Sequence, residues 1–332
     1  MAIDISQFKT TNALTDFSLR SANDMKSFVS DEVLTPAYVP KKQFKKYQYD
    51  LSNYRLTNGK ASSKAEAVKV DYGVFTSSAE ADLYKYSADV DPQDARDSDD
   101  VVADNDQDAA LTCMERALIQ KESVVMTKIT TAANYPSSLK ATLASGSRWS
   151  DVGGDPVGDI KTGKLAVRGI CGRMPNALLT TVEGLEALKI NEALKDRVKY
   201  TSGQSLTEDI IKNLLGIDEL IVAKAQYNGN MEGSSTQSLS NILGNFAVLF
   251  VKDPNQMRRT VCFGRTFYVT GGGSASQPGG FYTYKYVDNK RGSAAGRVEV
   301  IEVGMEYAAD FATVDSQSSG KVGAGYLLTT PV

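Results

Sequence analysis

Three aspartates spaced four residues apart are the first side chains in this sequence whose types and spacing could do chemistry. Asp151, Asp155 and Asp159 lie in the segment RWSDVGGDPVGDIKTGK, residues 148–164. Carboxylate oxygens are the ligands that suit a hard cation such as Mg²⁺ or Ca²⁺. One hypothesis is therefore a cation site, or a carboxylate acid–base site, built on these three side chains.

The same segment also has the features of a helix start, which is the interpretation we prefer. Asp155 precedes Pro156, and aspartate can cap free backbone N–H groups while proline is tolerated at the first helical position. Asp159 then falls in the next turn, and Asp151 is left to bond the preceding loop around Trp149. The glycines of the segment do not repeat the spacing of a calcium loop. We therefore predict a structural helix cap made by the three aspartates and Trp149, with no metal, no cofactor and no catalytic residue.

Composition narrows the possible chemistry further. The 332-residue chain contains no histidine, which removes the commonest general base, the usual serine and cysteine triads and the commonest transition-metal ligand. It has no GxxxxGK[ST] phosphate loop and no GxSxG nucleophile turn. Cys113, Cys171 and Cys262 are isolated, form no CxxC pair, and are expected to be buried free thiols. We therefore do not expect an enzyme.

Charge and hydropathy exclude two further classes of protein. The formal net charge is −3, which gives little general attraction to nucleic acid, so a dedicated DNA-binding domain is not expected. No run approaches the ~20 apolar residues that span a bilayer, and the first residues do not resemble an export signal. We expect that the protein does not associate with membranes and that it is synthesised in the cytoplasm.

An alternating pattern predicts a long β-hairpin in the first third of the chain. On one side Tyr47, Tyr49 and Leu51 alternate with polar residues, and Asn58-Gly59 is a strong turn signal. The alternating apolar residues on the other side are Val68, Val70, Tyr72 and Val74. A lone two-stranded ribbon is marginally stable and its edges invite pairing with another chain, so we expect it to lie on a neighbouring subunit.

Four lysines at the start of this hairpin form a basic cluster: Lys41, Lys42, Lys45 and Lys46. A nucleic-acid patch is one interpretation of such a cluster. On a strand, a solvated face or a contact to an acidic partner is the more usual one, and it is the one we adopt.

The rest of the chain predicts a long helix followed by alternating helices and strands. An aspartate-rich segment, 91–108, precedes apolar residues at helical spacing that end before residue 133. Strands are expected in 175–181, 217–228, 244–254, 281–307 and 325–332, and helices in 182–200 and 206–216. In the second of these helices Thr207 is the expected cap and Gly216 the expected end.

The order of these elements resembles that of the major capsid proteins of tailed double-stranded DNA bacteriophages, which have the Hong Kong 97 type capsid fold. RWSDVGGDPVGDI is similar to that family's W-S-D…D-P…D-I segment, and PNALLTTVEGLEALKINEALKDRVKYT to its P-N…L…DR-K-Y-T helix. NLLGIDELIVAKAQYN and the later FGRTFYV are similar to a third stretch. These segments cover most of 148–269, and the flanking elements extend the resemblance over nearly the whole chain.

The resemblance implies an α+β fold with named parts. They are an N-terminal arm at 1–41, an E-loop hairpin at 42–88, a peripheral domain with a spine helix at 89–165, an α/β axial domain at 166–275 and return strands at 276–332. It also implies that the segment with the three aspartates is architectural.

The same resemblance implies a function and partners. Many copies, as pentamers and hexamers, self-assemble into the icosahedral shell of a virion, which encloses double-stranded DNA without recognising its sequence. A portal protein is implied, and the short arm before the hairpin implies a separate scaffolding protein or a processed N-terminus. Crosslinks between subunits occur in some relatives; Lys60 and Lys64 are candidates by position, but we do not expect them to crosslink.

Two alternatives remain open. One is an encapsulin-like compartment of the same fold, which would differ by a pocket for cargo enzymes. The other is a cation-dependent enzyme that uses the aspartate triplet or the aspartates near 97–106. An enzyme should form a small oligomer, whereas a shell protein should form megadalton particles or pentameric and hexameric rings.

Overall fold

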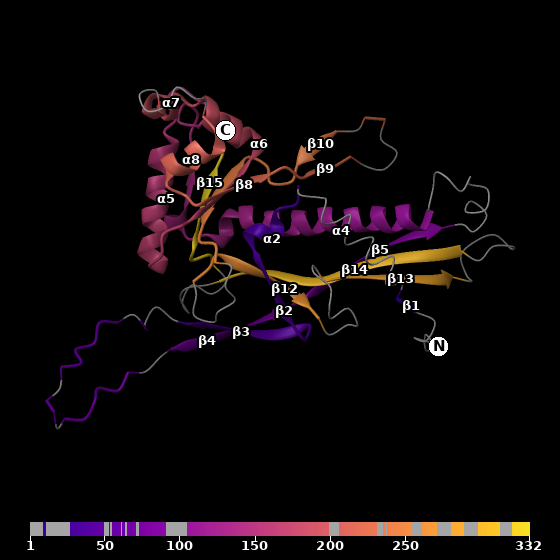
Figure 1. Cartoon of the computed structure of the whole chain (residues 1–332), viewed down its shortest axis with the longest axis horizontal. Helices are drawn as coiled ribbons and strands as arrows, with labels where there is room; N and C mark the ends of the chain where they lie inside the picture. Colours follow the sequence, from indigo (N-terminus) through magenta and orange to yellow (C-terminus); the bar gives the residue numbers. More distant parts are fainter. Residues whose placement is uncertain are drawn as a thin grey trace.

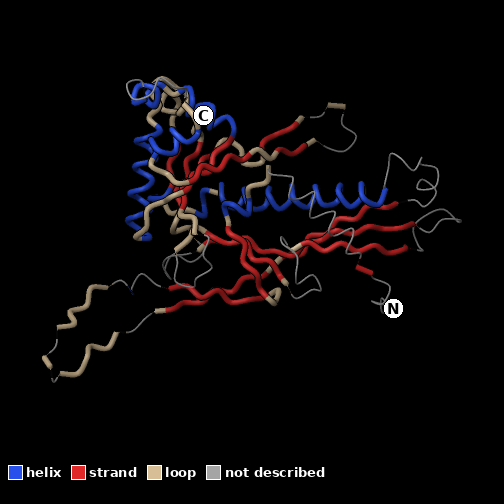
Figure 2. The backbone as a smooth tube through the Cα atoms, in the orientation of Figure 1, coloured by secondary structure: helices blue, strands red, loops and turns tan. Residues whose placement is uncertain are grey.

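The computed structural model of the chain describes residues 9–10, 27–49, 53, 55–60, 62–63, 65–70, 73–90, 105–198, 206–230, 235–236, 238–253, 261–270, 280–288, 298–312 and 321–332. In this part of the chain, two sheets are joined by one long helix, and a ribbon with an extended loop projects from one of them (Figures 1 and 2). None of the helices described there is long and apolar enough to cross a membrane.

The first sheet, which we call the large sheet, is built around the longest strand. Its order is β1-β13-β14-β12-β2, with β5 also paired to β14, and all pairs are antiparallel except β12 with β2. The strands are β1 (Lys9–Thr10), β2 (Thr35–Val39), β5 (Asp82–Val90), β12 (Gly264–Val269), β13 (Phe281–Asp288) and β14 (Val298–Phe311). Segments from both ends of the sequence therefore meet in one sheet.

Helix α4 (Asn105–Thr130) runs along the large sheet beside β5 and β14 (Figure 1). Met114, Ala117 and Leu118 of this helix are buried against Tyr268 and Met305 of the sheet. Apolar residues recur at helical spacing along the whole length of α4, so one face of the helix is apolar and packs on the sheet. The predicted long helix is confirmed. At its start Asp106 is paired with Lys285 of β13.

The second sheet, the small sheet, has the order β6-β15-β11-β7-β8. Its strands are β6 (Lys140–Thr142), β7 (Ala177–Thr181), β8 (Glu219–Ala223), β11 (Phe246–Phe250) and β15 (Gly325–Thr329). The helices around it are α5 (Pro156–Cys171), α6 (Val182–Ile190), α7 (Glu192–Val198) and α8 (Glu208–Leu215). The predicted strands at 175–181, 244–254 and 325–332 are confirmed by β7, β11 and β15.

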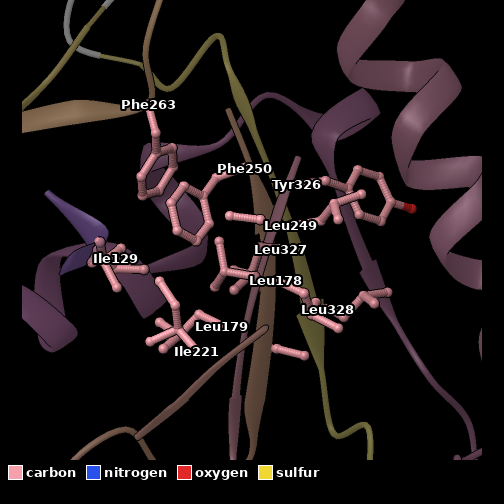
Figure 3. Close-up of a cluster of buried hydrophobic side chains, with 14 of the residues drawn as sticks. Ile129, Leu178, Leu179, Ile221, Leu249, Phe250, Phe263, Tyr326, Leu327 and Leu328 are labelled. Carbon is pink, nitrogen blue, oxygen red and sulfur yellow. The ribbon is translucent and has the colours of Figure 1, made fainter. Parts of the chain in front are cut away.

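One hydrophobic core links the small sheet to the end of α4. Leu178, Leu249 and Leu327, from three adjacent strands, are fully buried, and Ile129 of α4 belongs to the same cluster (Figure 3). Both faces of this sheet are covered, so its strands consist of short runs of consecutive apolar residues. These runs are the pattern from which the strands were predicted. The core fixes the long helix to both sheets.

Two predicted helical features differ in the structure. The helix expected over 182–200 is divided at Asn191, whose ψ of 127° is not helical and whose side chain accepts a hydrogen bond from Leu194 N. Val182, at the first position of α6, is 42% exposed. Thr207 occupies the cap position of α8 but makes no side-chain cap hydrogen bond, while Gly216 ends that helix with φ of 60°.

Apart from the ribbon and two 3-10 turns, Ala132–Asn134 and Ser137–Leu139, three short elements remain in the described part of the chain. Helix α2 (Ser30–Val33) precedes β2, and the strand predicted over 217–228 is divided into β8 and β9 (Gln226–Asn228). Strand β9 pairs with β10 (Leu239–Asn241) in a small hairpin. The three cysteines are buried and free, which confirms the prediction made for them.

The ribbon consists of β3 (Gln43–Tyr49) and β4 (Val74–Glu80), paired from Gln43 with Glu80 to Tyr49 with Val74. The prediction of a strand at Val68 and Val70 was therefore wrong, because β4 begins only at Val74: residues 66–70 are in no strand, and Val68 and Val70 are 48% and 71% exposed. The register is fixed at the other end of the ribbon, where Ala81 N donates a hydrogen bond to Lys42 O at 3.0 Å. Counting from that junction leaves Val68 and Val70 beyond the end of the ladder.

Beyond the ladder, Asn53 bonds both polar groups of Gly73 with its side-chain amide, at 2.8 and 3.0 Å. The predicted turn residues Asn58 and Gly59 lie in the exposed loop, where Asn58 Oδ1 accepts a hydrogen bond from Lys60 N. Other residues of the predicted hairpin lie outside the described residues, either entirely or in their side chains: Tyr47, Tyr49, Leu51, Lys64, Tyr72 and Val74.

Candidate functional site

Asp155 stands at the N-cap of α5. Its Oδ1 accepts a hydrogen bond from Gly158 N at 3.1 Å, and Pro156 takes the first helical position. The carboxylate lies so close to Gly158 that a Cβ on this glycine would come within 2.5 Å of Oδ2. The sequence pattern D-P-x-G thus gives the cap its acceptor, its first helical residue and the space it needs.

Asp159 is bonded to the buried tryptophan of the same segment. Trp149 is 0% exposed, and its Nε1–H donates to Asp159 Oδ2 at 3.0 Å. Burial raises the pKa of the Asp159 carboxyl, and the nearby Asp155 adds to this, while the hydrogen bond from Trp149 acts in the opposite direction. The carboxylate therefore satisfies the indole N–H at some cost in its own solvation.

Asp151 closes the turn before the helix. Its Oδ2 accepts hydrogen bonds from Gly146 N at 2.8 Å and from Arg148 N at 3.2 Å. The three aspartates thus act on different donors, and among the described residues no group of three histidine, cysteine, aspartate or glutamate side chains could hold a metal ion.

Asn191 is a central residue of this segment that sequence analysis missed. Its Nδ2 donates to Trp149 O at 2.9 Å and to Gly154 O at 3.2 Å, and its Oδ1 accepts from Leu194 N. The signal in the sequence was an asparagine between two helical stretches. Trp149 N also donates to Pro331 O at 2.7 Å, so the segment is tied to α7 and to the last strand's extension.

The loop of the ribbon is the most exposed part of the described chain. Every described residue of 55–70 is exposed, including Leu56, whose relative exposure is 102%. The loop extends away from both sheets (Figure 2). It carries basic side chains at Arg55, Lys60 and Lys69, beside the exposed valines. Apolar side chains held in water on an extended segment are typical of a contact surface.

The lysines at the start of the ribbon differ in their surroundings. Lys41 and Lys45 are exposed, Lys42 lies 3.5 Å from Glu80 across the ladder, and Lys46 is turned inward to Asp310 of β14. Two of the four, Lys42 and Lys46, therefore contact acidic groups of their own chain.

Comparison with known proteins agrees with this architecture. No protein-family profile matches the sequence. The major capsid protein of Burkholderia phage BcepMu is 27% identical over 136 residues, which are 41% of this chain and 44% of that relative, so the match spans less than half of the relative's length.

Solved structures match over much more of the chain. A phage-related protein from Bordetella bronchiseptica RB50 has a TM-score of 0.69 at 20% identity, over 98% of both chains. The capsid of cyanophage P-SCSP1u gives 0.56 at 10% identity, over 90% of this chain and 86% of that one. The mature capsid of bacteriophage PhiM1 gives 0.50 at 11% identity, over 89% and 85%. The chain therefore has the Hong Kong 97 type α+β capsid fold that its sequence resemblance predicted.

Proposed function

We propose that the chain is a major capsid protein, many copies of which assemble into an icosahedral shell around double-stranded phage DNA. The observation that carries this proposal is the sequence similarity to the major capsid protein of a Burkholderia phage, found in a chain that has a capsid fold over nearly its full length. The role is structural, and no reaction is assigned to the chain.

The parts of the fold receive roles on the same proposal. The large sheet with α4 is the peripheral domain, the small sheet with its helices is the axial domain, and 42–88 is the E-loop that reaches a neighbouring subunit. On this assignment β12 belongs to the peripheral domain, because it pairs within the large sheet, and β6 and β15 belong to the axial domain, because they pair within the small sheet. On this proposal the domain boundaries expected at 165 and 275 do not separate the two domains cleanly. Strand β6 lies before residue 165 but belongs to the axial domain, and β12 lies before residue 275 but belongs to the peripheral domain.

The aspartate segment has an architectural role in this proposal. Its hydrogen bonds hold the start of α5, the start of α7 and the C-terminal residues together. A rigid joint of this kind suits a subunit that must present the same surfaces in every copy of a closed assembly. The assignment of a cation-dependent enzyme would require these carboxylates to leave their present donors.

The partners are proposed from the resemblance. They are further copies of the chain in pentamers and hexamers, a separate scaffolding protein, a portal protein and packaged DNA that is not read by sequence. The net charge of −3 is compatible with a wall that does not grip DNA tightly. The protein would be made in the host cytoplasm and reside in the virion, without crosslinks through Lys60 or Lys64.

Sedimentation of the purified chain tests the proposal against both alternatives. The ratio of ultraviolet absorbance from nucleic acid to that from protein shows whether the particles contain DNA. A capsid protein should sediment as large particles or as pentameric and hexameric rings, and particles from infected or induced cells should contain DNA. Particles that contain a protein cargo and no DNA would favour the compartment. A small oligomer whose size does not change on adding scaffolding protein would contradict both shell assignments.

A further inference from the structure

Asp310 lies where the ribbon, the large sheet and the long helix meet. It is the second-last residue of β14, and its two carboxylate oxygens contact different lysines. Oδ2 is bonded to Lys46 Nζ of β3, and Oδ1 lies 3.4 Å from Lys128 Nζ of α4. One carboxylate therefore joins three elements that are far apart in the sequence.

The group is well shielded and its polar atoms are paired. The side chain of Asp310 is 26% exposed and that of Lys46 only 11%. Phe311 N donates to Asp310 Oδ1 at 2.9 Å, and Lys128 Nζ also donates to Ala309 O. An ion pair with this degree of burial is stronger than a surface pair, and removing one partner leaves a charge without compensation.

Burial alone would raise the pKa of the Asp310 carboxyl, but Lys128, Lys46 and the Phe311 amide outweigh it, so that the pKa lies below its usual value. Arg265 of β12 is the cross-strand partner of Asp310 in the sheet register. The carboxylate is thus charged wherever the chain is handled near neutral pH.

Among the described side chains of the ribbon, few others contact the body. Its two strands pair only with each other, and its chain connections to the body lie at one end, at the Lys42–Ala81 junction. Next comes a contact between the rings of Phe44 and Phe267, whose centroids are 4.7 Å apart. Lys46 is two residues farther toward the loop. Among the described side chains, its bond to Asp310 is the outermost ion pair that ties the ribbon to the body.

We propose that Asp310 is an electrostatic latch that sets the direction of the ribbon relative to α4. With Lys46 and Lys128 both bound, the ribbon is held against the end of β14. With the carboxylate neutralised or removed, the ribbon swings about the Lys42–Ala81 junction, and the exposed loop reaches a wider range of positions. The latch is a property of the single chain; its consequence for assembly rests on the proposed function.

The test measures the ribbon's direction in the unassembled, full-length chain. Spin labels at Thr76→Cys on β4 and Glu115→Cys on α4, both exposed positions, report the distance between the ribbon and the helix by pulsed electron resonance. The native thiols are buried, and the unsubstituted chain gives the background labelling. Circular dichroism checks that each variant is folded.

Asp310→Asn and Lys46→Met should each broaden the distance distribution or shift its maximum. Glu302→Gln is the matched control, because it removes an ion pair from the same strand, with Lys85 of β5 at 2.9 Å, that does not involve the ribbon. Its distribution should equal that of the parent chain. Two folded latch variants with the parent's distribution would overturn the proposal and assign the ribbon's direction to Phe44 and Phe267.

A separate measurement of particle yield distinguishes the latch from the function. If the label distances change as expected but the parent chain forms neither shells nor rings, even with its scaffolding protein, the latch stands and the capsid assignment fails. If shells form with normal yield and the distances do not change, the latch fails and the capsid assignment stands.

Discussion

At the scale of single residues, the aspartate segment is explained by hydrogen bonds within the chain. The cap of α5 could be predicted because its partners are local: Asp155, Pro156 and Gly158 are all within four positions. The contacts of Asn191 could not, because they reach Trp149 and Gly154 about forty positions away. A side chain's partners across such a separation depend on packing that no local pattern encodes.

Two of the three glycines of α5, Gly158 and Gly169, give a matched test of the cap. Gly169→Ala meets no atom within 4 Å and should stabilise the helix by up to about 1 kcal/mol, because alanine is the better helix former. Gly158→Ala should give a smaller gain or a loss, since its Cβ displaces the Asp155 carboxylate and a lost cap costs about 0.5–2 kcal/mol. Urea unfolding of both variants measures the difference. Equal gains at the two sites would show that the cap contributes nothing.

Asp159 predicts opposite effects for two substitutions. Asp159→Ala leaves the buried Trp149 N–H without an acceptor and should cost about 1–3 kcal/mol of unfolding free energy. Asp159→Asn keeps an acceptor for the indole N–H and removes the partly buried charge, so it should increase the free energy of unfolding. Neither change should abolish a metal-dependent activity.

The pH dependence of these variants follows from the direction of the shift. Burial raises the pKa of Asp159 in the folded chain, so the folded state favours the protonated carboxyl and loses stability as the pH rises from the usual pKa through the raised one. The stability of Asp159→Asn relative to the parent should therefore increase over that window. A difference that decreases with rising pH would contradict the assignment, and tight Mg²⁺ or Ca²⁺ binding that vanishes in the variant would sink it.

At the scale of elements, helices and buried strands could be predicted, whereas the ribbon's register could not. Helix α4 and strands β7, β11 and β15 have apolar patterns that match their own burial. The valines of 68–74 alternate as a strand would, yet the ladder is positioned by the junction at Lys42 and Ala81 and stops at Val74. Because one face of the ribbon is not buried in its own chain, the local pattern had no packing to enforce it.

The exposed loop should matter for assembly and not for the stability of the subunit. Deleting residues 55–64, or changing Val70 to Asp, should leave the unfolding midpoint nearly unchanged, since the described residues among them are exposed in the single chain. Either change should reduce the yield of large particles. Ser62→Asp is the control, as it adds the same charge at an exposed, polar position of the loop. Gel filtration with circular dichroism separates the two effects. Normal particles from the deletion variant would exclude the loop as an intersubunit element, whereas global unfolding would mean that it packs on its own chain.

At the scale of the whole molecule, the order of elements carried more information than any single motif. The resemblance in three stretches predicted the capsid fold, and the fold comparison bears it out over about nine-tenths of the chain. Which sheet each short strand joins was not predictable in the same way. Strands β6 and β15 join the small sheet through pairings between distant parts of the sequence, and no local pattern specifies such pairings.

The measurement that tests the central claim most directly is negative-stain electron microscopy of the purified chain, alone and after expression with the neighbouring genes of its source. The account predicts closed shells of uniform diameter, or pentameric and hexameric rings that convert to shells when the remaining partners are supplied. A chain that stays monomeric or dimeric under all of these conditions, while circular dichroism shows it folded, would contradict the assignment as a capsid protein.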